Sequence, residues 1–385
     1  MLLDGTLTNH LSLVNGLDSP YFSDGVDKFM LNWVSCLGYQ KLSDLLEQYT
    51  GHPILSDGGI KKYVLRKAVS ISELWELGRD KTEEAVLKIA VQKDINVYDK
   101  EAGEVILMMD DVGVKAQKPH KKVARIKTDA KRIDTTVVLI SIEEQSGKIS
   151  QEPAQTAEKI MILDSDDAIK SDNAIKDDKK GKPLYFPLTE GINKRGEVTY
   201  PIKLAIYYTL KQLYLAQNPD RQLPIVAITD GARSIRITLH ELFGEDLFII
   251  LDWYHLRLKV KNLMSMIAVN KTLKELYIKD LGALLWRGKA AEALEYIAQI
   301  TEVKNQDKLD ELAGYIQKHQ SEIIDYYTRQ LAGKTIGSGR CEKANDIIVA
   351  NRQKKKGMAW SRSGSKALAI VKTNQLQLNT FKNAA

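Results

Sequence analysis

Two consecutive units in the middle of the chain each consist of a short apolar run, an aspartate and a helical pattern. In the first unit the apolar run occupies residues 225–229 and is followed by Asp230. In the second unit the run occupies residues 247–251 and is followed by Asp252 and a helical stretch that contains His255. Repeated strand, acid and helix units predict parallel strands whose carboxyl ends meet at one edge of an α/β sheet.

A further strand pattern lies upstream, at residues 104–111, and it ends in the two carboxylates Asp110 and Asp111. A β-branched run at residues 135–144 and an apolar stretch at residues 182–191 predict two more strands. A buried strand that ends in an acid is a common way to build a metal site, although an isolated pair of aspartates can merely start a turn. The sequence therefore predicts an α/β fold with a mixed sheet flanked by helices.

The other patterned segments are mainly helical. The expected helices are residues 26–37, 40–49, 57–66, 70–88, 204–216, 271–285, 290–300, 309–330 and 363–378. Together with the strands they predict four regions: a helical N-terminal region at residues 1–100, a first part of the α/β core at 101–264, an all-helical insertion at 265–333, and a last part of the core with basic C-terminal helices at 334–385. A basic loop at 118–132 and a polar segment at 145–180 are expected to be exposed connections.

The helical N-terminal region contains one candidate DNA-reading element. Residues 30–68 read as helix, short turn and helix, then a third helix that would present Lys61, Lys62, Arg66 and Lys67. This resembles a helix-turn-helix, whose last helix enters a major groove. Many small helical packings share the same spacing, so ordinary packing remains the alternative.

The excess positive charge of the chain is concentrated near its C-terminus. Residues 340–366 carry eight basic and two acidic residues, a net charge of +6 that equals the net charge of the whole chain. Such focusing is typical of a surface that contacts a phosphate backbone, although a solvated basic helix face has the same composition. The candidate DNA contacts are Arg352, Lys354, Lys355, Lys356, Trp360 and Arg362, and for Trp360 either base stacking or core packing is open.

Composition excludes several classes of protein. The chain has 385 residues, of which 44% are hydrophobic and 28% charged, as in ordinary soluble globular proteins with two or three compact units. Its two cysteines, Cys36 and Cys341, can form neither a disulfide framework nor a four-cysteine zinc site. The N-terminus lacks a signal peptide and no apolar stretch is long enough to cross a bilayer. We therefore expect a cytoplasmic protein with no membrane partner and no small-molecule cofactor.

Three carboxylates stand out by position: Asp110 and Asp230 at strand ends, and Glu342 on a helix inside the basic region. Carboxylates that converge on one point repel each other and lose hydration, so such a cluster is stable mainly when cations neutralise it. All-oxygen ligands favour Mg²⁺ or Mn²⁺ over zinc. Two such ions about 4 Å apart would bind the attacking and leaving oxygens of an in-line phosphoryl displacement. The pattern thus indicates phosphodiester hydrolysis or transesterification.

Four motifs carry a resemblance to a known family: MMDDVGV, ITDGARSI, LDWYHLRLKV and GSGRCEKANDIIVANRQKKKGMAWS. In this order, with a helical insertion before the last, they resemble the DDE transposases with an RNase H-like core. More narrowly, they resemble the bacterial insertion-sequence enzymes of the ISKra and ISLre types, relatives of the Mutator-like transposases. The resemblance covers residues 100–380, and the first hundred residues match only loosely.

The resemblance implies roles for particular residues. Asp110, Asp230 and Glu342 would be the metal-binding triad, and Asp252 with His255 would match the D-x-x-H element of the family, with His255 near the scissile phosphate. The first aspartate of the family is usually followed by glycine, whereas here Asp111 stands in that place. Either aspartate could then be the ligand; the register of Val112 and Val114 favours Asp110.

The resemblance also implies an activity and partners. Two Mg²⁺ ions would support cleavage at transposon ends and transfer of the 3′-hydroxyl into target DNA, by a homodimer on double-stranded DNA, and the protein would be associated with the bacterial nucleoid. One alternative is an RNase H-like nuclease, which shares the triad but needs no strand transfer. Another is a domesticated or inactive transposase derivative that only binds DNA.

Overall fold

The computed structural model describes residues 2–3, 6–7, 24–77, 88–92, 94–118, 131–143, 184–216 and 223–384. Most of the basic loop expected at residues 118–132 and all of the polar segment expected at 145–180 lie outside the described residues.

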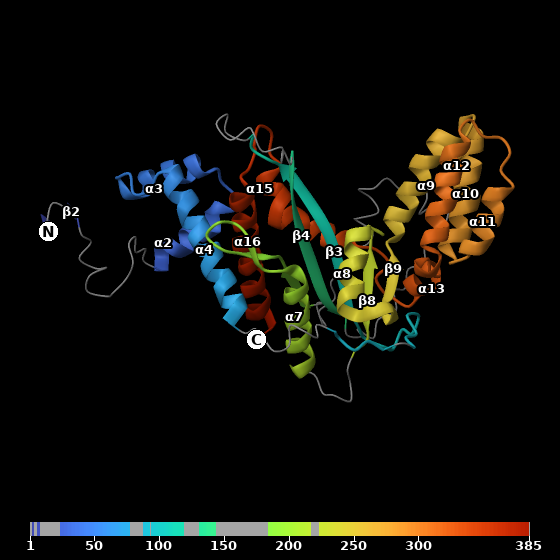
Figure 1. Cartoon of the computed structure of the whole chain (residues 1–385), viewed down its shortest axis with the longest axis horizontal. Coiled ribbons are helices and arrows are strands. Elements are labelled where there is room, and N and C mark those ends of the chain that lie inside the picture. Colours follow the sequence, from blue (N-terminus) through green and yellow to red (C-terminus); the bar gives the residue numbers. More distant parts are fainter. Residues whose placement is uncertain are drawn as a thin grey trace.

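A five-stranded mixed sheet with the order β5-β4-β3-β8-β9 forms the centre of the protein (Figure 1). Its strands are β3 Glu104–Lys115, β4 Arg132–Glu143, β5 Leu184–Leu188, β8 Ile225–Thr229 and β9 Phe248–Leu251. β4 pairs antiparallel with both β3 and β5, while β8 is parallel to β3 and β9 to β8. The first three strands of this sheet along the chain, β3, β4 and β5, pair antiparallel with their neighbours. β8 and β9 then extend the sheet beyond β3 as parallel strands, which is the arrangement of an RNase H-like sheet. The predicted fold class is confirmed.

Two small hairpins lie outside this sheet. One pairs β1 Leu2–Leu3 with β2 Thr6–Leu7, and the other pairs β6 Gly191–Ile192 with β7 Val198–Tyr200. The strand expected at residues 182–191 therefore stops at the end of β5, and its last residue belongs to β6. A Cβ at this position would lie 2.8 Å from the Cβ of Tyr200, so glycine lets the second hairpin pack closely.

Helices cover both faces of the sheet. On one face, Leu107 of β3 packs in a common core with α7 Ile202–Ala216 and α8 Arg233–Phe243. On the opposite face, Met108 packs in a common core with α9 Trp253–Ile267. Neighbouring residues of a strand point to opposite faces. Each later residue of β3 can therefore be assigned to one of these two layers by its position.

A block of helices follows α9 and forms the right-hand end of the protein in Figure 1. Its elements are α10 Lys271–Trp286, α11 Ala290–Ala298, α12 Gln306–Lys318 and α13 Tyr326–Leu331. Trp286 is buried in this block and stacks on Tyr326, with 6.0 Å between ring centroids and 11° between ring planes. Trp286 therefore belongs to the hydrophobic core of the block.

The helix expected at residues 309–330 is interrupted, so that prediction is wrong. α12 ends before His319, and η5 Gln320–Glu322 separates it from α13. Asp325 then starts α13 by accepting a hydrogen bond from the Thr328 backbone N–H at 3.0 Å. A hydrogen-bonded cap within the expected helix marks a new helix start.

The two helices expected at residues 57–66 and 70–88 form a single helix, α4 Asp57–Leu77, as far as the structure describes them. Nothing between the two predicted segments breaks a helix, because residues 67–69 include neither glycine nor proline. The end of the second prediction reaches into residues that the structure leaves undescribed.

The N-terminal helices α2 Asp24–Val34, α3 Tyr39–Thr50 and α4 lie against the last helix, α16 Arg362–Ala384 (Figure 1). They share one hydrophobic core with α16 and with Val112 of β3. Of the basic residues expected to read DNA, Lys61, Lys62 and Arg66 are exposed, whereas Lys67 pairs with Asp27 at 2.9 Å. DNA reading by α4 stays a prediction. The division of the chain into four regions stays a prediction as well.

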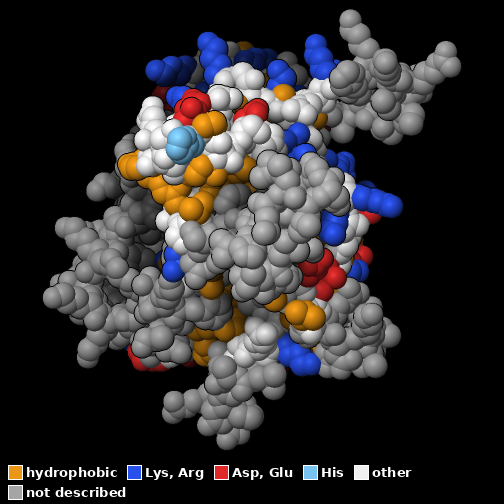
Figure 2. All heavy atoms as spheres, turned by 90° about the vertical axis from the view of Figure 1, so that its left-hand side faces the viewer, with side chains coloured by type: hydrophobic (Ala, Val, Ile, Leu, Met, Phe, Trp, Pro, Cys, Tyr) orange, Lys and Arg blue, Asp and Glu red, His pale blue; other side chains and the backbone are white. Residues whose placement is uncertain are grey.

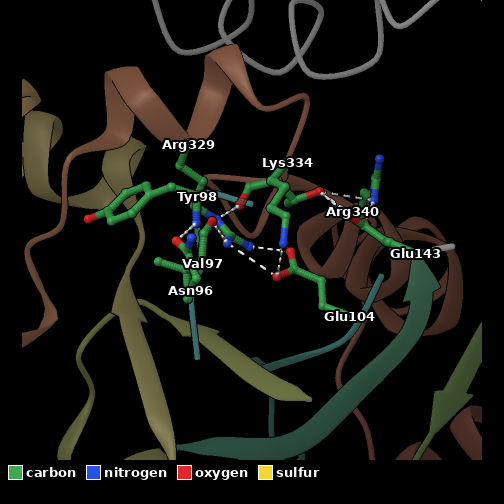
Figure 3. A network of polar contacts seen from close by, with 9 residues as sticks. Asn96, Val97, Tyr98, Glu104, Glu143, Arg329, Lys334 and Arg340 are labelled. Atoms are coloured by element: carbon green, nitrogen blue, oxygen red, sulfur yellow. Dashed lines mark hydrogen bonds and ion pairs between the residues drawn. The ribbon is translucent and has the colours of Figure 1, made fainter. Parts of the chain in front are cut away.

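A buried ion-pair network fixes the return of the chain from the helical block to the sheet (Figure 3). The fully buried Arg329 donates from Nη2 to Oε1 of Glu104, the first residue of β3, at 2.5 Å. Lys334 Nζ reaches the other oxygen of Glu104 at 3.2 Å, and Arg340 pairs with Glu143 at the end of β4. Removing one partner of such a pair leaves an uncompensated buried charge, so the network holds this segment firmly.

The segment leads into an almost continuous helix made of α14 Gly339–Asn345, η6 Asp346–Ala350 and α15 Asn351–Gln353. The middle part, η6, is a π-helix, which inserts one extra residue per turn. Among the residues that the structure describes, no helix is long and apolar enough to cross a membrane.

Candidate active site

Strand register brings Asp110 and Asp230 to the same level of neighbouring strands. Met108 of β3 pairs with Ile228 of β8, and each aspartate lies two residues further along its chain. Asp110 also shares its face of β3 with Met108, so it lies in the layer of α9. Burial raises the pKa of Asp110, and the negative charge of Asp230 raises it further.

Asp111 lies on the opposite face of β3. It pairs with Thr136 of β4 and accepts a hydrogen bond from the Thr136 hydroxyl at 2.5 Å. Asp111 is therefore engaged with β4, while Asp110 is the aspartate that shares a face with the other candidate residues.

Asp252 follows β9 and is completely enclosed by protein groups. Its Oδ1 accepts from the His255 backbone N–H at 3.0 Å, which caps the start of α9. Its Oδ2 accepts from both the backbone N–H and the hydroxyl of Ser338. Burial opposes ionisation, but the hydrogen bonds and the charge of His255 outweigh it, so the pKa of Asp252 is lowered. Its oxygens are used within the protein and join β9 to the segment before α14.

The His255 ring lies between two carboxylates. Its Nδ1 is 3.5 Å from Asp252 Oδ1 and its Nε2 is 3.7 Å from Glu342 Oε1. Burial works to lower the pKa of His255, but the hydrogen bond and charge of Asp252, then the charges of Glu342 and Asp230, raise it to about 9. His255 therefore carries a positive charge at neutral pH and partly neutralises the surrounding carboxylates.

Glu342 is positioned by the packing of α14 on the sheet. The neighbouring Cys341 is buried in the core beneath it, and its Sγ donates to the Val137 carbonyl of β4 at 3.7 Å. Burial raises the pKa of Glu342; His255 lowers it, whereas Asp252 and Asp110 raise it by their charges. The charge of Asp230 thus acts on Asp110, and the charge of Asp110 acts on Glu342.

A hollow of about 210 Å³ opens beside Asp110 and Glu342. It is lined by Asp110, Asp111, Val112, Gly113, Arg132, Glu342, Asn345, Asp346 and Lys354. The Arg132 side chain crosses Gly113 so closely that a Cβ there would lie 1.6 Å from its Nε. The hollow therefore combines carboxylates with two basic side chains, an arrangement suited to a phosphate held next to a cation site.

Comparison with known proteins gives distant matches. No family model matches the chain. The "UPF0236 protein in vanSb 3'region" of Streptococcus gallolyticus is 26% identical over an alignment of 258 residues, and the match covers 61% of this chain. The chain spans about half of that relative, 54% of its length. The solved "Drosophila P element transposase strand transfer complex" matches with 11% identity and a TM-score of 0.25, over 97% of this chain and 83% of that chain. A TM-score this low does not establish a shared fold.

The carboxylates of Asp110 and Glu342 beside the hollow, together with Asp230 after β8, fit a hard divalent cation by their chemistry. Asp110, Asp230 and Glu342 offer oxygen ligands, and proximity and burial leave two of them with raised pKa values that a cation would lower again. Within the described part of the chain, no three His, Cys, Asp or Glu side chains lie together in the arrangement of a metal site. Asp110 is thus close enough to feel the charge of Asp230 and to act on Glu342, and the role of the three residues in holding a metal stays a prediction.

Two of the predicted DNA contacts lie in the protein core. Arg352 is 3% and Trp360 8% exposed, and the Arg352 guanidinium lies 4.9 Å from the centre of the Trp360 ring. The Trp360 Nε1 donates to the Gln353 carbonyl at 3.0 Å, and its ring packs edge-on against Tyr39 of α3. Both side chains join the α15 turn to the N-terminal helices, so the sequence-based placement of Arg352 and Trp360 on the DNA is corrected.

The other basic candidates are at the surface. Lys354, Lys355, Lys356 and Arg362 are exposed, and Lys354 lines the hollow. At the end of the molecule formed by α2–α4, Lys and Arg side chains gather along the upper edge of the visible face (Figure 2). Lys355 also links the turn after α15 to the N-terminal helices, because its Nζ donates to the backbone carbonyl of Cys36 at 3.4 Å.

One residue of the site was missed by the sequence analysis. Asn345 lines the hollow, and its Nδ2 donates to Asp110 Oδ2 at 2.6 Å. The available signal was its spacing, because residues three apart on a helix share a face and Asn345 comes three residues after Glu342. Because asparagine carries no charge, the criterion of clustered carboxylates did not identify Asn345.

Proposed function

We propose that the chain is a DDE-type transposase that cleaves DNA at transposon ends and transfers the exposed 3′-hydroxyl to target DNA. The observation that supports this function best is the placement of Asp110 and Asp230 at the same level of neighbouring parallel strands in an RNase H-like sheet, with Glu342 beside the same hollow as Asp110. Such a sheet carries many unrelated functions, so the argument depends on the residues and not on the fold.

Asp110, Asp230 and Glu342 would hold one or two Mg²⁺ or Mn²⁺ ions. When bound, the ions would activate the attacking oxygen and offset the charge that develops on the scissile phosphate. The three carboxylates act as ligands, so an amide at any of these positions removes charge and ligand strength at nearly constant volume. No covalent link between protein and DNA is needed.

His255 would contribute a fixed positive charge beside Glu342. With a pKa of about 9 it is protonated under physiological conditions, and its ring is half-buried. An imidazolium at this place can donate a hydrogen bond to a phosphate oxygen that enters the hollow. Asp252 keeps the ring oriented and charged, which is a positioning role and not a ligand role.

Lys354, Lys355, Lys356 and Arg362 would contact the DNA backbone next to the hollow. Their exposed side chains lie C-terminal to Glu342 on the same run of helix and turn, so DNA held by them would pass the candidate active site. We further propose that two chains act as a dimer on DNA, since two transposon ends must be joined.

The proposal is tested by a cleavage and strand-transfer assay with Mg²⁺ on double-stranded DNA that spans the flanks of the gene. Wild-type protein is compared with Asp230→Asn and Glu342→Gln, and the exposed Glu302→Gln serves as a matched control. We expect joined products with the wild type and the control, and loss of at least 100-fold, roughly the effect of removing one group that stabilises the transition state, with the other two.

The assay also separates the alternatives. Cleavage without joining, lost in both active-site variants, would support an RNase H-like nuclease. DNA binding with no reaction in any of the four proteins would leave a transposase derivative that only binds DNA.

A further inference from the structure

The side chain of Asn345 forms a short hydrogen bond with Asp110, one of the three candidate metal ligands. Its Nδ2 lies 2.6 Å from Asp110 Oδ2, and the residue is only 5% exposed. Glu342 lies one helical turn earlier on the same helix, and both residues line the hollow. One turn of α14 therefore carries one candidate ligand and the hydrogen-bond donor to another.

The amide of Asn345 can be oriented in only one useful way. With Nδ2 toward Asp110, a donor meets a carboxylate oxygen; with the amide reversed, two acceptors would face each other. The chosen orientation leaves Asn345 Oδ1 buried, and it accepts no hydrogen bond from any residue that the structure describes. A buried oxygen without a donor destabilises the folded protein. The Asn345 amide thus donates a hydrogen bond to Asp110, while its own oxygen has no donor among the described residues.

The backbone around Asn345 is also unusual. Asn345 is the last residue of α14, and the π-helix η6 starts at the next residue, Asp346, which lines the hollow as well. π-Helical turns are rare and occur frequently at functional sites. Here the extra residue lets the helix present residues to the hollow both before and after the irregularity.

We propose that Asn345 is a positioning residue for the cation site: its amide holds the Asp110 carboxylate in the orientation that a Mg²⁺ or Mn²⁺ ion requires. This inference rests on the proposed function, because it presupposes that Asp110 is a metal ligand. A hydrogen-bonded partner behind a ligand fixes its direction before the ion arrives, and losing such a partner typically lowers metal affinity about 10- to 100-fold.

The competing explanation is that Asn345 only stabilises the contact between α14 and β3. In that case its replacement would lower stability by the same amount with and without the ion. Replacement by aspartate separates the two explanations, because it places a second carboxylate where the donor to Asp110 was. Repulsion between the two carboxylates should then destabilise the free protein, and a cation should relieve it.

The experiment is a titration of the full chain with Mn²⁺ alone, followed by electron paramagnetic resonance of free Mn²⁺, with thermal unfolding measured in EDTA and in saturating Mn²⁺. The proteins are wild type, Asn345→Ala, Asn345→Asp, Asp110→Asn and the control Asn351→Ala, an exposed asparagine of α15. We expect Asn345→Ala to weaken Mn²⁺ binding about 10- to 100-fold and the control to bind like the wild type. Asn345→Asp should unfold at a lower temperature than the wild type in EDTA and gain more from Mn²⁺ than the wild type does.

Two results would overturn the inference, and they differ. If Asp110→Asn loses Mn²⁺ binding while Asn345→Ala keeps the wild-type affinity and Asn345→Asp gains no more from Mn²⁺ than the wild type, Asn345 is structural and the proposed function stands. If wild type and Asp110→Asn bind Mn²⁺ equally weakly, the cation site itself is refuted, and the role of Asn345 falls with it. Should Asn345→Asp fail to fold, the affinity of Asn345→Ala decides.

Discussion

The carboxylate of Asp252 accepts two hydrogen bonds from Ser338, one from its backbone N–H and one from its hydroxyl, although the two residues are 86 positions apart. Asp252 lies between β9 and α9, and Ser338 directly precedes α14, which carries Glu342. The chain leaves the sheet after Asp252, forms the helical block, and returns to the sheet at Ser338. Their contact closes the block at its base and holds the residue before α14, the helix that carries Glu342.

Replacing Asp252 by alanine should therefore unfold the protein more easily. The change removes the cap of α9 and leaves both donors of Ser338 without an acceptor in a buried place, so we expect a loss of about 3 kcal/mol in the free energy of unfolding. Urea denaturation measures it. The same replacement of Asp307, which is exposed on α12, should change stability by less than about 0.5 kcal/mol; an equal loss in both would contradict the structural role of Asp252.

The charge on His255 should make stability depend on pH. Its pKa is raised from 6.5 to about 9 in the folded protein, so the folded state holds the proton more tightly than the unfolded state does. The resulting stabilisation is complete below pH 6.5 and is lost as the pH rises to about 9. Thermal unfolding of wild type and His255→Gln across this range should give a difference that is largest at the acid end and shrinks as the pH rises. A difference that grows with pH would show that the ring is held neutral.

Gly231 should tolerate no side chain, for two separable reasons. Its φ of +83° is a left-handed conformation, and a Cβ there would lie 2.7 Å from Cε1 of the buried His319. Gly333 has a similar φ of +73°, but a Cβ there would meet no described atom within 4 Å, so this position isolates the backbone effect. We expect Gly333→Ala to cost about 1 kcal/mol and Gly231→Ala roughly 3 kcal/mol in unfolding free energy, as measured by urea denaturation. Equal costs would mean that the His319 ring moves away freely.

The exposed lysines after Glu342 should determine how DNA binding responds to salt. Changing Lys354, Lys355 and Lys356 together to alanine removes up to three phosphate contacts, and each contact contributes about 0.9 to the slope of log affinity against log salt. Fluorescence anisotropy with duplex DNA measures the slope. A triple change of the exposed Lys271, Lys279 and Lys318 in the helical block alters net charge equally and should leave the slope near the wild-type value. Equal slopes in the two triple variants would place the DNA elsewhere.

Much of the sheet could be predicted from the sequence, because the information is local. The bounds of β8 are those expected from its apolar run, and Asp230 follows it at the strand end. A run of buried β-branched and aliphatic residues bounded by an acid and a glycine specifies a short buried strand without reference to its partners. The RNase H-like type of core was implied by the resemblance that the motifs carry.

The contacts between distant segments were decided by tertiary structure alone. The sequence left open whether Asp110 or Asp111 is the ligand and favoured Asp110; the pairing of β3 with β4 and β8 turns Asp110 toward Asp230 and Asp111 toward Thr136. Arg352 lies close to exposed lysines in the sequence, yet it is buried against the rings of Tyr39 of α3 and Trp360. Asn345 has no charge and stands out only once it meets Asp110. The sequence by itself determined most strands and helices and the acids that follow β8 and β9, because those follow from neighbours a few residues apart. Which side chains meet depends on the register and packing of segments far apart in the chain, where the burial of one group is decided by another that no local pattern contains.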